Sequence, residues 1–184
     1  EKRFASPRQL YKGGGMERVL YEENEKCALL KDLGINVNLA PVVDIATEKN
    51  AFMYDRSLGQ DAQITADFAV NVVTLMDSYS LGSCLKHFPG YGNNPDTHTG
   101  MARDSRSLSQ LEENDLLPFA AGIKAGCDAI LVSHTVVECF DPETPASLSP
   151  AVHDYLRETM GFEGVIVTDD LVMQAITDTY GAGE

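Results

Sequence analysis

Residues 164–170 read G-V-I-V-T-D-D, a short run of apolar and β-branched residues that ends on two acids. Residues 127–134, C-D-A-I-L-V-S-H, repeat this pattern and end on a histidine. Continuously apolar runs of this length are typical of strands that are buried on both faces of a parallel sheet. We therefore expect two neighbouring strands here, each followed by a polar side chain.

Outward from these runs, the chain alternates expected strands and helices. Further strands are expected at 35–43 and 82–86, and helices at 17–33, 61–80, 108–125 and 150–160. Gly13–Gly15 is interpreted as an entry to the first helix, and Ser109 as the cap of the third, with Glu112 completing a capping box. Pro118 predicts a kink or a broken first turn in that third helix.

Four strand and helix units in succession predict an α/β fold, with a parallel sheet covered by helices. Composition does not decide between a doubly wound sheet and a (β/α)8 barrel of the TIM type. The polar residues favour the barrel, because its active site lies at the carboxyl ends of the strands. Residues at expected strand ends are Asp44, Lys86, His87, His134 and Asp169.

Composition and net charge limit the classes of partner that the chain is expected to bind. With 184 residues, 43% hydrophobic residues and a net charge of −14, it is expected to fold as one domain that binds neither nucleic acid nor membrane. We expect no transmembrane span and no signal peptide within these residues. The compartment stays open, with the cytoplasm favoured. The four cysteines lack metal-binding spacing and are expected to be reduced, mostly buried thiols.

The segment from 84 to 100, C-L-K-H-F-P-G-Y-G-N-N-P-D-T-H-T-G, concentrates titratable groups in a loop rich in glycine and proline. Asp96 and His98 stand two residues apart, so the carboxylate could orient the imidazole for proton transfer. The alternative is an Asx turn at Asp96 beside an exposed histidine. Both interpretations stay open on the residues alone.

The other candidates also have structural alternatives. Asp169 could attack an electrophilic carbon, or could cap the next helix, a role that suits Asp170 better. Arg56 could bind a polar ligand together with Lys86 and His87, or could form an exposed salt bridge. The Ser133–His134 pair gives a weaker signal for the same site. The sequence contains no nucleophile elbow, P-loop or dinucleotide fingerprint.

Four stretches together resemble glycoside hydrolase family 3, and in particular its bacterial β-N-acetylhexosaminidase branch. They are K-H-F-P-G-Y-G-N-N-P-D-T-H, G-F-E-G-V-I-V-T-D-D-L-V-M, G-I-N-V-N-L-A-P-V-V-D and D-R-S-L-G. The resemblance implies that residues 1–184 are the central part of the family's N-terminal catalytic barrel domain. It also implies a retaining glycosidase that needs no metal or organic cofactor and acts on oligosaccharides or cell-wall glycans.

By this resemblance Asp169 is the nucleophile that forms a glycosyl-enzyme, and His98 is the general acid/base with Asp96 as its partner. Arg56, Lys86 and His87 match positions that hold sugar hydroxyls. The family loop commonly reads K-H-F-P-G-H-G-D-T, whereas Tyr91 and Asn93 stand here in place of the second histidine and the acid. We expect altered loop geometry with the chemistry retained.

The chain is expected to hold only part of the barrel. It has four strand and helix units, and the family's D-Q-E-G-G-x-V-x-R segment is missing from it. An open half-barrel leaves unpaired edges, so we expect a portion of a longer protein or a chain that assembles with another copy. On its own such a portion would be inactive or nearly so.

Three other functions remain as alternatives. One is a β-glucosidase or glycoside phosphorylase of the same family. Another is a metal-dependent hydrolase with His87, Asp96, His98 and Asp169 as ligands. The last is an inactive chain that only binds saccharide or assembles with another chain.

Overall fold

A sheet of four parallel strands forms the centre of the computed structural model, which describes residues 3–94 and 100–180. The strands are β1 (Val37–Asn38), β2 (Gly82–Phe88), β4 (Ala129–Val132) and β6 (Val165–Thr168). They lie side by side in chain order, and every pair is parallel. Because the order never reverses, the sheet matches a sector of a barrel and not a doubly wound sheet.

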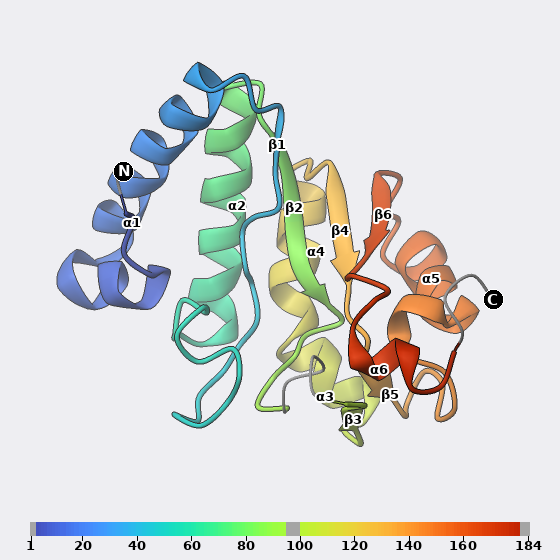
Figure 1. Ribbon diagram of the computed structural model, residues 1–184. Helices are drawn as coiled ribbons and strands as arrows, with labels where there is room; N and C mark the ends of the chain where they lie inside the picture. Colours follow the sequence, from blue (N-terminus) through green and yellow to red (C-terminus); the bar gives the residue numbers. More distant parts are fainter. Residues whose placement is uncertain (1–2, 95–99, 181–184) are drawn as a thin grey trace.

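Helices connect the strands, and most of them pack against one face of the sheet (Figure 1). They are α1 (Pro7–Asp32), α2 (Ala62–Ser78), α3 (Leu108–Glu113), α4 (Leu116–Lys124), α5 (Pro150–Asp154) and α6 (Gln174–Thr177). A 3₁₀ turn, η2 (Ala146–Leu148), precedes α5, and a π-type turn, η3 (Tyr155–Thr159), extends it. A small second sheet joins β3 (Arg103–Asp104) to β5 (Val136–Val137).

The main hydrophobic core lies between the sheet and these helices. Leu85 of β2 and Ile130 of β4 point into it and meet α2 and α4. The rings of Phe88 and Phe119 pack edge to face, with centroids 5.2 Å apart. Burial of such side chains stabilises the fold by about 1.5–3 kcal/mol each. The helix α1 packs on α2 through a second core, so it lies further from the strands.

The opposite face of the sheet is the one that a closed barrel would enclose. Cys84, Leu131 and Val167 form a small cluster on it. Towards the edges this face loses its cover, and the side chains of Val37 and Val165 are 54% and 63% exposed. The prediction of an incomplete barrel sector therefore agrees with the exposed edges of the sheet.

The expected strand at 35–43 is shorter than predicted. Regular pairing covers only β1, and an isolated bridge links Val42 to Lys86. Pro41 interrupts the ladder because it has no N–H to donate. The segment still runs along β2, since the carbonyls of Ala40 and Pro41 accept hydrogen bonds from the backbone of Cys84 and Lys86.

The predicted entry at Gly13–Gly15 is wrong, because α1 already begins at Pro7. Ser6 caps it and forms a capping box with Gln9. The glycines instead make a kink inside the helix, where Gly15 has a positive φ of 64° that glycine adopts without strain.

The expected helix at 108–125 is divided into α3 and α4. Its cap is Ser107, whose capping box uses Gln110, so the prediction of Ser109 with Glu112 was displaced by two residues. The break before α4 lets Pro118 sit in a first turn, where its missing N–H costs no helical hydrogen bond. The predicted broken turn is therefore confirmed.

The expectations for the cysteines and for membrane-spanning segments can be compared with the structure. All four cysteines are free thiols, and three of them are buried. Among residues 3–94 and 100–180, no helix has both the length and the hydropathy that a bilayer crossing requires.

Candidate active site

Polar side chains meet at the carboxyl ends of the central strands. Lys86 lies near the end of β2, two residues after Cys84, and Asp169 directly follows β6, two residues after Val167. Because side chains alternate along a strand, both residues share the face of the cluster that a barrel would enclose. Only β4 lies between β2 and β6, so the two backbones are about 10 Å apart.

Asp44 is buried beside the carboxyl end of β2 and hydrogen-bonds to the residues there. It is 1% exposed, and its carboxylate accepts three hydrogen bonds. One oxygen accepts from the backbone N–H of His87 at 3.2 Å and contacts Nδ1 of the same residue at 2.7 Å. The other accepts from the N–H of Tyr91 at 2.7 Å. A buried carboxylate with three N–H partners fixes both the end of β2 and the turn that follows it.

His87 connects Asp44 to Arg56. Its Nδ1 contacts the carboxylate, and its Nε2 lies 3.3 Å from a guanidinium nitrogen of Arg56. A guanidinium only donates, so Nε2 accepts and the proton of the neutral ring sits on Nδ1. Both ring nitrogens are therefore engaged, and the ring holds the half-buried Arg56 in place.

Lys86 is half-buried in the middle of this group. Burial lowers the pKa of its ammonium, and the nearby charge of Arg56 lowers it further. Asp169 and Asp44 act in the opposite direction by attracting the ammonium. Arg56, Asp169 and Asp44 therefore each lie within electrostatic reach of Lys86.

The backbone holds Asp169 on both sides. Its N–H donates to the carbonyl of Val132 in β4 at 3.0 Å, and its Oδ1 accepts from the N–H of Asp170 at 3.0 Å. The side chain is partly exposed and lies above the enclosed face of the sheet. It is thus an oriented carboxylate at the open edge of the site.

His134 and Ser133 do not line an open mouth, because both side chains are buried. Nε2 of His134 donates to the carbonyl of Asp170 at 2.9 Å, and Nδ1 contacts the hydroxyl of Ser147 at 2.7 Å. The histidine therefore supports the loop after β6. The alternative of Asp170 as the cap of the next helix is not found. Met173 stands at the N-cap of α6, and the carboxylate of Asp170 accepts from the N–H of Val172 ahead of it.

Asp96 and His98 lie outside the described residues. The segments on either side of them are described. The turn at 90–94 follows β2, and residues 100–104 lead into β3. Asn93 accepts from the backbone N–H groups of Thr47 and Glu48 at 3.0 and 3.2 Å, so the turn also contacts the loop after Asp44.

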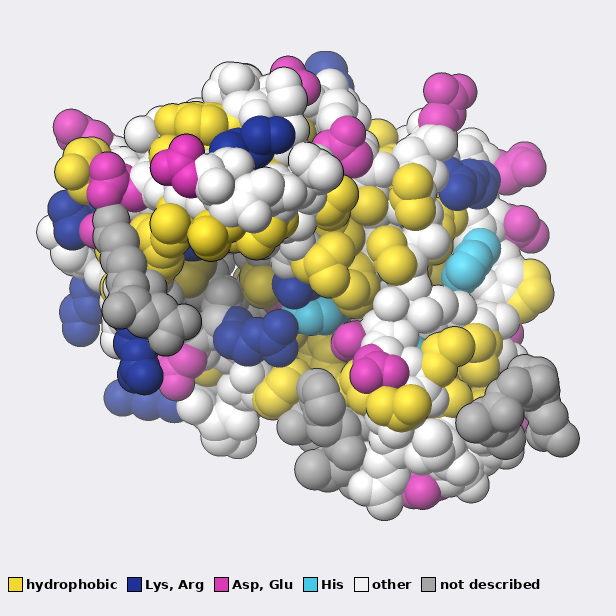
Figure 2. Space-filling model, turned by 45° about the horizontal axis from the view of Figure 1, so that its top comes forward, with side chains coloured by type: hydrophobic (Ala, Val, Ile, Leu, Met, Phe, Trp, Pro, Cys, Tyr) yellow, Lys and Arg dark blue, Asp and Glu magenta, His cyan; other side chains and the backbone are white. Residues whose placement is uncertain are grey.

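A hollow crosses the face shown in Figure 2, and Lys or Arg side chains, a His side chain and acidic side chains lie together along it. Cationic donors beside carboxylates suit a polyhydroxylated ligand, which both donates and accepts hydrogen bonds. Among the described residues, no group of three or more His, Cys, Asp or Glu side chains could hold a metal ion.

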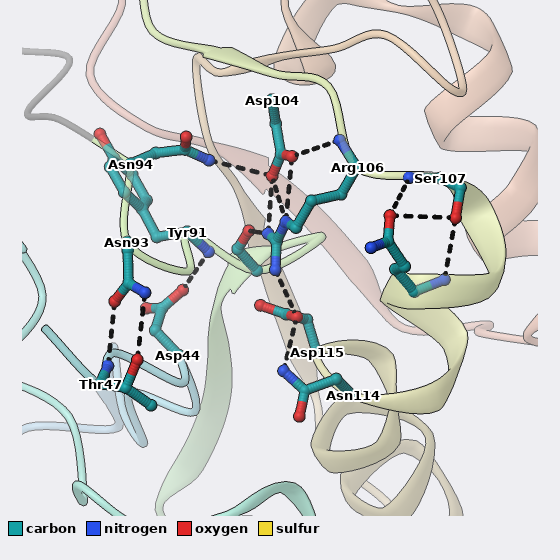
Figure 3. Close-up of polar contacts among 12 residues, drawn as sticks. Asp44, Thr47, Tyr91, Asn93, Asn94, Asp104, Arg106, Ser107, Asn114 and Asp115 are labelled. Atoms are coloured by element: carbon teal, nitrogen blue, oxygen red, sulfur yellow. Dashed lines mark hydrogen bonds and ion pairs between the residues drawn. The ribbon is translucent and has the colours of Figure 1, made fainter.

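Sequence reasoning missed two parts of this region. Asp44 was noted only as a residue at a strand end, although it organises His87 and Tyr91. The ion cluster of Asp104, Arg106 and Asp115 was not predicted at all (Figure 3). A signal for the cluster was present, since Asp115 opens the apolar stretch L-L-P-F, where an unpaired acid would be costly.

Comparison with known proteins identifies the family of this fold and site. The sequence profile described as the Glycosyl hydrolase family 3 N terminal domain matches residues 23–184. The chain belongs to glycosyl hydrolase family 3. The predicted resemblance is therefore confirmed, and the matched range includes every candidate site residue.

Two relatives of this chain are named beta-hexosaminidase. The protein of Xylella fastidiosa (strain M12) is 40% identical over 149 residues, and that of Stenotrophomonas maltophilia (strain K279a) is 41% identical over 144 residues. The alignments cover 80% and 77% of this chain but 44% and 42% of the relatives. The chain thus spans less than half the length of these proteins.

Solved structures of family 3 proteins share the fold. A β-N-acetylglucosaminidase from Paenibacillus sp. str. FPU-7 has a TM-score of 0.91 at 32% identity, covering 97% of this chain and 35% of that one. A family 3 glycosyl hydrolase from Mycobacterium smegmatis has a TM-score of 0.86 at 32% identity, covering 96% and 55%. The predicted (β/α)8-type barrel is confirmed, with this chain forming part of it.

Proposed function

We propose that residues 1–184 form the central part of a family 3 catalytic barrel that removes terminal β-linked N-acetylglucosamine from saccharides with retention of configuration. One observation carries the proposal. Lys86 and Asp169 lie at the carboxyl ends of parallel strands, where barrel enzymes carry out their chemistry, and both Asp169 and Arg56 are within electrostatic reach of Lys86. The names of the family 3 relatives support the choice of sugar.

In the first step, an oxygen of Asp169 attacks the anomeric carbon from the face opposite the leaving group. The glycosidic bond breaks, and His98 gives its proton to the leaving oxygen, so the electron pair of that bond leaves with a neutral alcohol. In the second step, water attacks the glycosyl-enzyme while His98 takes one of its protons. The carboxylate of Asp169 is released, and the product keeps the β configuration.

Asp96 serves as the partner of His98. A carboxylate that accepts a hydrogen bond from one ring nitrogen leaves the other nitrogen to exchange the proton, and it stabilises the ring when that ring is charged. This pair takes the place of the second carboxylic acid found in most retaining glycosidases.

Arg56 and Lys86 supply the donors for sugar hydroxyls. Both side chains are half-buried, so their hydrogen bonds to a ligand are less weakened by water than those of exposed side chains. The direct contact of His87 with a hydroxyl stays a prediction. In the structure its Nε2 already accepts from Arg56, so it also contributes by holding the guanidinium towards the site.

The proposal is tested with the full gene product and two aryl substrates, a β-N-acetylglucosaminide and a β-glucoside. We expect release of the aryl alcohol from the first at a much higher kcat/KM, with no need for phosphate. Preference for the glucoside would support a β-glucosidase, and dependence on phosphate would support a phosphorylase. Either result would overturn the proposed substrate or reaction.

A further inference from the structure

A buried ion cluster lies at the base of the segment that connects β2 to β3 (Figure 3). Arg106 donates to Oδ2 of Asp104 at 2.6 Å and to Oδ2 of Asp115 at 2.6 Å. The side chains of the two acids are only 2% and 1% exposed, and that of Arg106 is 29% exposed. The cluster lies outside the group formed by Asp44, Lys86 and Asp169, and the mechanism above does not use it.

Arg106 joins three parts of the chain that are separate in sequence. Its Nε donates to both oxygens of Asp104 in β3, each at 3.0 Å. A terminal nitrogen contacts Asp115 at the break between α3 and α4, and the other also donates to the carbonyl of Gly90 at 3.2 Å. The planar fork of a guanidinium fixes these contacts in direction as well as in distance.

The same cluster ties together the two described ends of the segment. Asn94, at the end of the first part, donates to Oδ2 of Asp104 at 2.9 Å. Asp104 belongs to β3, which pairs with β5 through Val137. Residues 94 and 104 are therefore linked directly, and Arg106 adds a second link between Gly90 and Asp104. In sequence, Asp96 and His98 stand between the linked residues 94 and 104.

The two acids of the cluster differ in how far Arg106 compensates the burial of their charges. Burial raises the pKa of Asp104, but the hydrogen bonds and charge of Arg106 outweigh it and lower the pKa overall. Burial dominates for Asp115 and raises its pKa despite Arg106. Its Oδ1 has no hydrogen-bond partner among the described residues. Because desolvation offsets much of the attraction in buried ion pairs, such a cluster adds little net stability, whereas it does fix geometry.

We infer that Arg106 is a positioning residue for proton transfer. It fixes the two described ends of the segment 90–104, and the proposed proton-transfer pair, Asp96 and His98, depends on these fixed ends for its action on the leaving group. The inference rests on the proposed function. Arg106 itself touches no reacting atom in this account. Its effect is specific to proton donation, because Asp169 is held separately by β4 and by its own neighbour.

Proton donation can be measured separately from the rest of catalysis through the leaving group. A dinitrophenolate leaves without help from an acid, whereas a phenolate or a sugar alkoxide needs the proton. The parameter kcat/KM reports on steps up to cleavage of the glycosidic bond. The slope of log kcat/KM against the pKa of the leaving phenol therefore measures acid assistance.

The experiment compares the full gene product with its Arg106→Lys variant on a series of aryl β-N-acetylglucosaminides. Lysine keeps the positive charge but lacks the planar set of N–H donors of the guanidinium. We expect kcat/KM for the phenyl substrate to fall by about 100-fold, at the low end of general acid contributions, and that for the dinitrophenyl substrate to change by about threefold or less. The matched control is Arg103→Lys, whose side chain is exposed and makes only peripheral contacts.

Three results decide the inference. A steeper leaving-group slope for Arg106→Lys, with the control unchanged, supports it. An unchanged slope, or an equal loss on all substrates, overturns it. If Arg106→Lys does not fold, Asn94→Ala removes one link between the two ends and must steepen the slope, and an unchanged slope again overturns the inference. A wild-type protein that releases no N-acetylglucosamine would instead refute the proposed function itself.

Discussion

The carboxylate of Asp44 is the polar group on which the site depends most, and Asp44→Asn tests this dependence. Three N–H donors converge on it in a site that is 1% exposed. An amide offers one acceptor oxygen and puts an NH2 group where the second oxygen was. At least one buried N–H then loses its partner, at a cost of about 1–3 kcal/mol. Loss of the charge weakens the remaining bonds by about 1 kcal/mol.

We therefore expect Asp44→Asn to lower the free energy of unfolding by about 2–4 kcal/mol, a large fraction of the stability of a typical domain. Urea unfolding followed by far-UV circular dichroism measures the change, as a lower midpoint with an unchanged slope. Asp32→Asn, at the exposed end of α1, is the control and should stay within about 0.5 kcal/mol of wild type. A stability equal to that of the control would refute the assigned role of Asp44.

Three further predictions address other parts of the fold. A thiol reagent should label one cysteine, the exposed Cys139, in the native protein and all four after denaturation, and rapid native labelling of more than one would contradict the buried thiols. Gly90→Ala should destabilise the protein by about 1–3 kcal/mol in thermal or urea unfolding, because its φ is 116° and the added Cβ would lie 2.6 Å from Asp115. Although burial opposes it, Arg106 holds the pKa of Asp104 below its usual 3.8, so ionised Asp104 stabilises the fold at neutral pH and this contribution is lost as the pH falls below that value. Asp104→Asn should flatten the acid limb of the stability curve below about pH 4, and an unchanged limb would contradict the assignment.

The sequence was sufficient to predict the strands at 127–133 and 164–168, because continuous apolar runs report burial on both faces of a sheet. The sequence was less informative where a proline or a capping side chain ends an element at a different residue from the one that the hydrophobic pattern predicts. Pro41 limits the first strand to a short pair although the residues around it alternate, and Ser107 caps α3 instead of Ser109. Both differences concern which backbone N–H groups find partners, and that depends on neighbours distant in sequence.

For the site, position at strand ends and the family resemblance pointed to Arg56, Lys86 and Asp169, which the fold brings to one end of the sheet. Their roles stay predictions. The sequence could not show that His87 uses both ring nitrogens, because the contact with Arg56 joins residues 31 positions apart. The role of Arg106 was hidden for the same reason. Its partners come from three segments, and only the folded chain brings them together.

The assignment of Asp169 as the nucleophile is the central claim, and trapping the glycosyl-enzyme tests it most directly. A fluorinated N-acetylglucosamine derivative with an activated leaving group slows the second step, so the covalent intermediate accumulates. Mass spectrometry of the proteolysed full gene product should then find the sugar on the peptide G-V-I-V-T-D-D-L, attached to Asp169. A sugar attached to any other residue, or a product released with the α configuration, would contradict the account.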